Sequence, residues 1–126
     1  MKAVFLLTAA VMSVNIGPAS ATVITYDCQF SKHTSPSGLE IDAHPFILKF
    51  IVDATTHKSY ILGSQATSEV HAIQELSGGI AFIEVTDSGN VMTTAITPKG
   101  DSVHSRNSIM MGDLIPTQYY GTCLKH

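Results

Sequence analysis

The residues best suited to chemistry lie within residues 102–108, where His104 and the only arginine of the chain, Arg106, are two positions apart. Side chains two positions apart in a β-strand point to the same face, so these two would project together from a strand. A guanidinium binds carboxylate or phosphate groups through a planar fork, and an imidazole adds a donor that depends on pH. The sequence therefore predicts a binding face at this pair. In a structural alternative, Arg106 pairs with Glu84 of a neighbouring strand and anchors the sheet.

Glu84 and Tyr120 complete the candidate binding residues. Glu84 is the acidic residue expected on a strand close to Arg106. Two tyrosines, Tyr119 and Tyr120, shortly precede Cys123, and neighbouring residues in a strand alternate between its two faces. One ring should therefore pack beside the cysteine while the other faces outward. An exposed tyrosine here would be a plausible contact residue, and Tyr120 is included among the candidate binding residues.

Catalytic and metal sites lack the spacing that they require. Asp101, His104 and Ser105 supply the residue types of a nucleophilic triad, but adjacent strand residues point to opposite faces and no G-x-S-x-G turn is present. The six histidines are scattered along the chain, and Asp42 with His44 comes nearest to a pair of metal ligands. We predict a non-enzymatic protein with no metal and no cofactor. A metal-binding or hydrolytic function is the less favoured alternative.

The first 21 residues have the organisation of a secretory signal peptide. Lys2 precedes an apolar stretch over residues 3–14, and a small-x-small pattern ends at Ala21. We therefore predict cleavage between Ala21 and Thr22. The apolar stretch is about 12 residues long, whereas a membrane span needs roughly 20. The expected product is a single β domain of residues 22–126, located in the periplasm or secreted, with no membrane span.

Two cysteines lie near the two ends of the expected mature chain. In an oxidising compartment Cys28 and Cys123 have only each other as partners, so we predict one disulfide. Neither cysteine belongs to a C-x-x-C pattern, which favours a structural bond over a reactive thiol. Closing a loop of about 100 residues stabilises a domain by roughly 4–5 kcal/mol in the chain-entropy description.

The spacing of turn residues indicates an all-β fold. Turn signals rich in Gly, Pro, Asp and Asn recur at intervals of roughly ten residues, between short segments rich in Ile, Val, Thr and Phe. This pattern predicts a small antiparallel barrel or sandwich of about eight strands, and we favour the barrel because closure satisfies the strand edges. The expected strands cover residues 23–30, 46–54, 59–63, 68–73, 80–86, 91–97, 102–111 and 118–124. An irregular connection is expected over residues 31–45, and Pro116 is read as a turn residue.

Two features of the pattern stay open. Residues 66–76 carry apolar side chains at helical spacing as well as at strand spacing, so both a strand and a helix fit, and we favour the strand. In residues 80–86 either Phe82 or Ile83 could lead the face that packs in the core. Residues 87–90 are a strong hairpin connector, so residues 80–111 are expected to form a three-stranded meander.

Composition excludes several classes of partner. The formal net charge is −3 and one arginine accompanies six lysines, so no basic cluster is available to neutralise a run of phosphates in nucleic acid. An acidic balance also disfavours binding to anionic lipid. A mean hydropathy of +0.22 with 13% charged residues disfavours disorder. The expected partner is therefore another protein or a small ligand, and we expect a monomer.

Four segments, residues 79–86, 89–96, 103–106 and 116–123, resemble a group of small secreted Gram-negative bacterial proteins of unknown function. This resemblance implies an exported β domain and carries no activity with it. A fainter, architectural likeness is to the small barrel inhibitors of c-type lysozyme, which share a Tyr-x-Cys near the mature start, here Tyr26 to Cys28, and a late cysteine.

The likeness to these inhibitors implies a second function. Their inhibitory Ser-Gly and Lys-Gly loops would correspond to Ser77-Gly78 and Lys99-Gly100, although the two loops are farther apart in this chain than in that family. An inhibitor of this kind requires both loops to protrude at one end of the barrel. We therefore keep two hypotheses: a module that binds a protein or small ligand through loops and the face of His104 and Arg106, and a periplasmic inhibitor of a cell-wall hydrolase.

Overall fold

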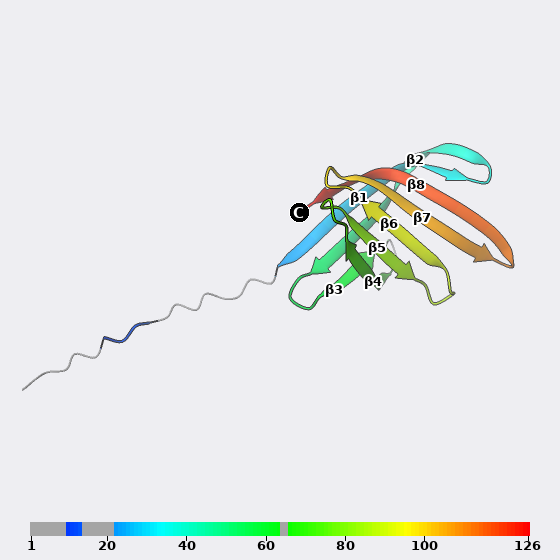
Figure 1. Ribbon diagram of the computed structural model, residues 1–126. Helices are drawn as coiled ribbons and strands as arrows, with labels where there is room; N and C mark the ends of the chain where they lie inside the picture. The colour runs from blue at the N-terminus through cyan, green and yellow to red at the C-terminus, as the bar shows by residue number, and fades with distance from the viewer. Residues whose placement is uncertain (1–9, 14–21, 64–65) are drawn as a thin grey trace, which may run out of the picture.

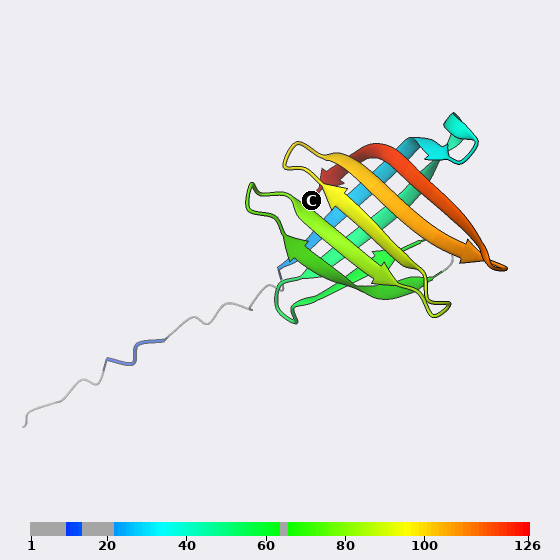
Figure 2. The ribbon, with the colours of Figure 1, turned by 45° about the vertical axis from the view of Figure 1, so that its right-hand side comes forward.

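The computed structural model describes residues 10–13, 22–63 and 66–126. Within these ranges the chain forms eight antiparallel strands that close into a barrel, with no helix among them (Figures 1 and 2). The predicted signal peptide, residues 1–21, lies outside the described residues except for 10–13, which form neither helix nor strand. In the described part of the chain, no helix has the length and apolar character needed to cross a membrane.

The strands follow one another around the barrel in chain order. Their bounds are Val23–Ser35 (β1), Gly38–Asp53 (β2), Lys58–Leu62 (β3), Thr67–Gln74 (β4), Ile80–Val85 (β5), Val91–Ile96 (β6), Asp101–Met110 (β7) and Asp113–Lys125 (β8). Each strand pairs with the next, and β8 pairs with β1 to close the barrel. The all-β prediction and the preference for a barrel are confirmed. The strand β4 also settles the question over residues 66–76 in favour of a strand.

Alternation of side chains determines which face of each strand lies in the core. Phe82 is 1% exposed, so the face of β5 that carries Phe82, and not the face that carries Ile83, packs in the core. Its ring stacks on Phe50 of β2 with a centroid distance of 4.2 Å and meets Tyr26 of β1 edge-on. These contacts cross the inside of the barrel and join strands that are far apart in the sequence. Burial of these large rings is the main stabilising contribution of the core.

The predicted irregular connection over residues 31–45 is wrong. There β1 and β2 continue as a hairpin, with His33 opposite Glu40 and a turn at residues 36–37. A shift of register between Phe30 and Lys32 marks a bulge, which interrupts the alternation and hides the strand from a pattern search. The prediction also overlooked the alternation of apolar and acidic residues over residues 39–42, which is itself a strand pattern.

Strand β8 also begins earlier than predicted, at Asp113, so the assignment of Pro116 to a turn is wrong. Pairing of β8 with β1 ends at Gln118, whereas pairing with β7 continues to Asp113. Pro116 therefore lies in a segment with a partner on one side only, where a strand tolerates proline.

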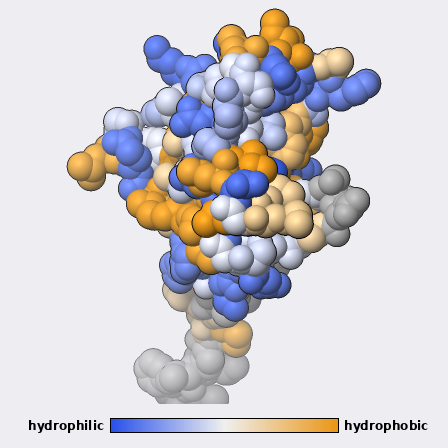
Figure 3. Space-filling model, turned by 90° about the vertical axis from the view of Figure 1, so that its right-hand side faces the viewer, coloured by the Kyte–Doolittle hydropathy of each residue, from blue (hydrophilic) through white to orange (hydrophobic). Residues whose placement is uncertain are grey.

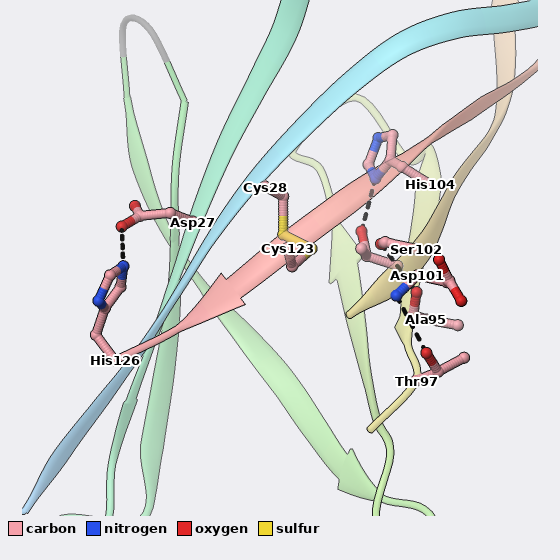
Figure 4. Close-up of a disulfide and its surroundings, with 10 residues drawn as sticks. Asp27, Cys28, Ala95, Thr97, Asp101, Ser102, His104, Cys123 and His126 are labelled. Carbon is pink, nitrogen blue, oxygen red and sulfur yellow. Dashed lines mark hydrogen bonds and ion pairs between the residues drawn. A yellow bond between two sulfur atoms is a disulfide. The ribbon is translucent and has the colours of Figure 1, made fainter. Parts of the chain in front are cut away.

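The disulfide closes the barrel at the seam between its first and last strands. Cys28 of β1 lies opposite Cys123 of β8, and the two sulfur atoms are bonded (Figure 4). Both residues belong to the buried core, with Cys28 fully buried. The predicted pairing is confirmed. Because these strands are 95 residues apart in sequence, the bond covalently fixes the pairing that makes the sheet a barrel.

Candidate functional site

The candidate residues lie in the half of the barrel from which two hairpins project. The β1–β2 and β7–β8 hairpins extend beyond the other turns on the same side of the molecule (Figures 1 and 2). On the inward face below them, the structure brings together side chains of β2, β5, β7 and β8. We call this group the mouth cluster: Phe46, Glu84, His104, Arg106 and Tyr119.

His104 is the buried centre of the mouth cluster. It is 1% exposed and lies among the rings of Phe30, Phe46 and Tyr119, with centroid distances of 5.7–5.9 Å. Its Nε2 atom accepts a hydrogen bond from Arg106 Nε at 3.0 Å, and its Nδ1 atom lies 2.7 Å from Thr94 Oγ1. A guanidinium can only donate, so Nε2 carries no proton and Nδ1–H donates to the threonine.

The environment keeps His104 neutral. Burial, and to a smaller extent the positive charge of Arg106, together lower the pKa of its imidazole from 6.5 to about 4. A neutral imidazole is the form that can accept from Arg106. At neutral pH the histidine is therefore a fixed acceptor that orients the arginine, and it does not act as the pH-dependent donor that the sequence suggested.

Arg106 is held from several sides. Its guanidinium carbon lies 4.7 Å from the centroid of Phe46 and 5.4 Å from that of Tyr119, both within the range of a cation–π contact. With the bond from Nε to His104, these contacts fix the plane of the group. In the described part of the chain, no hydrogen bond or ion pair engages its two terminal nitrogens.

Glu84 faces the same interior from β5. It lies opposite Met92 of β6, which lies opposite Arg106 of β7, so one strand separates the acid from the base. Burial raises the pKa of the Glu84 carboxyl, and the charge of Arg106 partly offsets this. The charge of Arg106 acts on Glu84 from a distance. The two side chains form no ion pair with each other, and neither forms one with another described residue. The direct pair of the structural alternative is therefore not formed.

Tyr120 lies apart from the mouth cluster. Its hydroxyl donates to Gln118 Oε1 at 2.9 Å and lies 3.4 Å from Thr34 Oγ1, on the outer face of β8. The other tyrosine of the pair, Tyr119, faces inward and packs on Phe46 with a centroid distance of 4.8 Å. The sequence predicted the alternation, but the packing partner of the inward ring comes from β2, which no local pattern indicates.

A second polar group, which sequence reasoning missed, lies beside the mouth cluster in the β1–β2 hairpin. His33 Nδ1 is 2.8 Å from Asp42 Oδ1, and its Nε2 is 3.3 Å from Glu40 Oε2. The hydrogen bond to Asp42 raises the pKa of His33 above 6.5, and the charges of both acids act in the same direction. The His33 ring also packs on Tyr119 at 5.4 Å, which connects this hairpin to the mouth cluster. Because the sequence pattern predicts an irregular connection over residues 31–45, it provides no strand register that would pair these side chains.

The nucleophilic triad and the metal site considered from the sequence do not form in the described residues. No group of three His, Cys, Asp or Glu side chains is placed to hold a metal ion there. Ser105 lies on the opposite face of β7 from His104 and accepts a hydrogen bond from Gln118 Nε2 at 3.3 Å. His44, the metal ligand considered with Asp42, is exposed.

The projecting end of the barrel carries exposed apolar side chains. They lie at the ends of the two projecting hairpins. Figure 3 views the molecule from the side on which the hairpins project, and the hydrophobic surface there falls in several separate areas. These residues are Leu39, Ile41, Ile109, Met110, Met111 and Leu114.

The two loops suggested by the likeness to lysozyme inhibitors meet at the opposite end of the barrel. Ser77-Gly78 lies in the turn between β4 and β5, and Lys99-Gly100 in the turn between β6 and β7. A side chain at Gly78 would lie 3.5 Å from Pro98, so the turns are in contact. Both contribute to the lining of one cavity of about 310 Å³.

A comparison with protein-family models, with curated proteins and with solved structures finds no match to this chain.

Proposed function

We propose that this protein is a non-enzymatic binding module that holds a small ligand by a carboxylate group at the mouth of the barrel. The observation that carries the proposal is the state of Arg106. Its guanidinium is fixed by His104 and two aromatic rings, while no described residue engages its terminal nitrogens. A guanidinium with two free parallel donors matches the two oxygens of a carboxylate.

Preorganisation of Arg106 favours binding. An unrestrained arginine loses side-chain entropy when it binds, at a cost of about 0.5–1.5 kcal/mol. Here the contacts with Phe46, Tyr119 and His104 already restrict the side chain. His104 also occupies Nε, so a ligand is left with the terminal edge of the guanidinium. The partial burial of Arg106 reduces competition from water, which strengthens a charge-assisted hydrogen bond.

Export is part of the same proposal. The Cys28–Cys123 bond supports a location outside the reducing cytoplasm. The pattern of residues 1–21 supports a signal peptide that directs the chain to the periplasm or to the medium.

Isothermal titration calorimetry tests the proposal with 3-phenylpropionate as the probe and the protein lacking residues 1–21. We expect saturable binding by the wild type. Arg106→Gln should weaken it by about 10-fold to 100-fold, because a hydrogen bond to a charged group contributes roughly 1.5–3 kcal/mol. Lys99→Gln, at the opposite end of the barrel, removes one positive charge elsewhere and should leave the affinity unchanged.

Two results would overturn the proposal. One is that a wild type whose disulfide is intact binds neither 3-phenylpropionate nor L-phenylalanine, which carries the same ring and a carboxylate. The other is equal weakening by the two substitutions, which would indicate general attraction to positive charge. Thermal unfolding of each variant verifies that the barrel still forms.

A second candidate function is inhibition of a cell-wall hydrolase by the opposite end of the barrel. The contact between the turns at Gly78 and Pro98 supports it, because an inhibitor of this kind needs both loops at one end. Lysis of bacterial cell walls by a c-type lysozyme tests it. If the candidate is correct, the wild type and Arg106→Gln inhibit lysis equally, whereas a Ser77→Ala, Lys99→Ala double variant loses inhibition. Absence of inhibition by the wild type would exclude it.

A further inference from the structure

The mouth cluster contains a second charged group, Glu84, with which no described residue forms a direct pair. Glu84 is half-buried on the inward face of β5 and takes part in no hydrogen bond or ion pair between described residues. A carboxylate that loses water without gaining a partner is destabilised. The raised pKa of Glu84, caused first by burial, agrees with this description.

The geometry explains why Glu84 and Arg106 do not pair directly. Met92 lies between them in the register, so their backbones are about 10 Å apart, twice the spacing between neighbouring strands. Phe46 and Tyr119, which belong to β2 and β8, hold the guanidinium on the side of the barrel away from β5. Two opposite charges thus point into one interior and stay apart.

We infer that the ligand of this site is a zwitterion, such as an amino acid, whose carboxylate binds Arg106 and whose ammonium group binds Glu84. The inference rests on the proposed function and extends it from the binding of a carboxylate to a class of ligand. A ligand with both charges satisfies both groups at once, whereas a simple carboxylate satisfies Arg106 and places its own negative charge near Glu84. The site therefore selects against the simple carboxylate.

Three probes with the same phenylethyl skeleton separate the contribution of the carboxylate to binding from that of the ammonium group. L-Phenylalanine carries both charges, 3-phenylpropionate lacks the ammonium group, and 2-phenylethylamine lacks the carboxylate. We expect the wild type to bind L-phenylalanine at least about tenfold more tightly than either of the others. In Glu84→Gln the advantage of L-phenylalanine over 3-phenylpropionate should disappear, and 3-phenylpropionate itself should bind as well or better. Glu69→Gln, an exposed outward-facing acid of β4, is the matched control and should keep the advantage.

A second readout does not depend on affinity. Binding of an ammonium group beside Glu84 should lower the pKa of its carboxyl, as measured by NMR, because an adjacent positive charge favours the ionised form. Binding of 3-phenylpropionate should raise it or leave it unchanged. An equal effect of the two probes on this pKa would contradict the inference.

The outcomes distinguish the two proposals. Equal affinity of the wild type for L-phenylalanine and 3-phenylpropionate, both lost in Arg106→Gln, overturns the zwitterion and keeps the carboxylate site. The same holds if the advantage of L-phenylalanine survives in Glu84→Gln. Failure of both probes to bind the wild type overturns the proposed function as well.

Discussion

At the scale of single residues, the site depends on a histidine that is kept neutral. His104 accepts from Arg106 through Nε2 and donates to Thr94 through Nδ1, so protonation would remove the acceptor and place two positive charges side by side. Arg106 is consequently oriented by a group that carries no charge. The same contacts explain why this histidine is buried almost completely: both of its nitrogens are satisfied inside the barrel.

The neutral state of His104 predicts a loss of stability in acid. Its pKa is about 4 in the folded protein and 6.5 in the reference state, so between these values the unfolded chain binds more protons. The stabilisation is complete above pH 6.5 and is lost as pH falls toward 4, by about 3 kcal/mol in total. Urea unfolding of the wild type and His104→Gln at pH 7 and pH 4 measures it. The wild type should lose more stability than the variant, and equal losses would contradict this description.

The sequence predicted part of this site. Alternation along a strand placed His104 and Arg106 on one face, and the observed inward face of β7 agrees with that prediction. The contacts that orient the pair involve Phe46 and Tyr119, which lie on β2 and β8. These neighbours depend on how the sheet closes, and closure is a property of the complete barrel that no local pattern contains.

At the scale of elements, the β1–β2 hairpin is held by a charged hydrogen bond near the mouth. We expect NMR titration to give His33 a pKa above 6.5, and Asp42→Asn to lower it, because the hydrogen bond to Asp42 is its first cause. Since the folded pKa is raised, the stabilisation is complete below pH 6.5 and is lost as pH rises through the folded value. His44, an exposed histidine of the same hairpin, is the internal reference. An unchanged His33 titration in Asp42→Asn would show that the hydrogen bond is not formed in solution.

Closure of β8 on β1 depends on a glycine. A Cβ atom at Gly121 would overlap the carbonyl oxygen of Gln29, so the two strands approach too closely for any side chain. We expect Gly121→Ala to lower the free energy of unfolding by about 2–3 kcal/mol, in the range of other overpacked sites. The control is Gly63→Ala, where the nearest atom of a described residue is 3.8 Å away and the change should be small. Equal effects of the two substitutions on urea unfolding would contradict the close approach.

At the scale of the whole molecule, one disulfide and a core of aromatic and aliphatic side chains hold a closed sheet. The alternating pattern and the turn spacing predicted the eight strands, and the positions of the cysteines predicted the bond. The lengths of β1, β2 and β8 were not predicted, because the bulge after Phe30 and the proline at 116 interrupt the patterns on which such predictions depend. These extensions form the projecting hairpins that border the mouth.

The disulfide should contribute strongly to the stability of the complete barrel. Substitution of both Cys28 and Cys123 by serine should lower the free energy of unfolding by about 4 kcal/mol, as expected for a loop of this length. Because the bond lies at the β1–β8 seam, the loss should reduce protection of amide protons in these two strands first. Urea unfolding and hydrogen exchange measure both effects. Two free thiols in the intact mass of wild-type protein prepared under oxidising conditions would contradict the structure.

In the proposed function, the terminal nitrogens of Arg106 receive the carboxylate of a ligand. Since the chain contains a single arginine, the side-chain guanidinium signals in a ¹⁵N spectrum belong to Arg106 without further assignment. We predict that addition of L-phenylalanine shifts the signals of the terminal nitrogens and slows their rotation, while the Nε–H bonded to His104 shifts less. Unchanged guanidinium signals at concentrations that saturate binding elsewhere on the protein would contradict the claim.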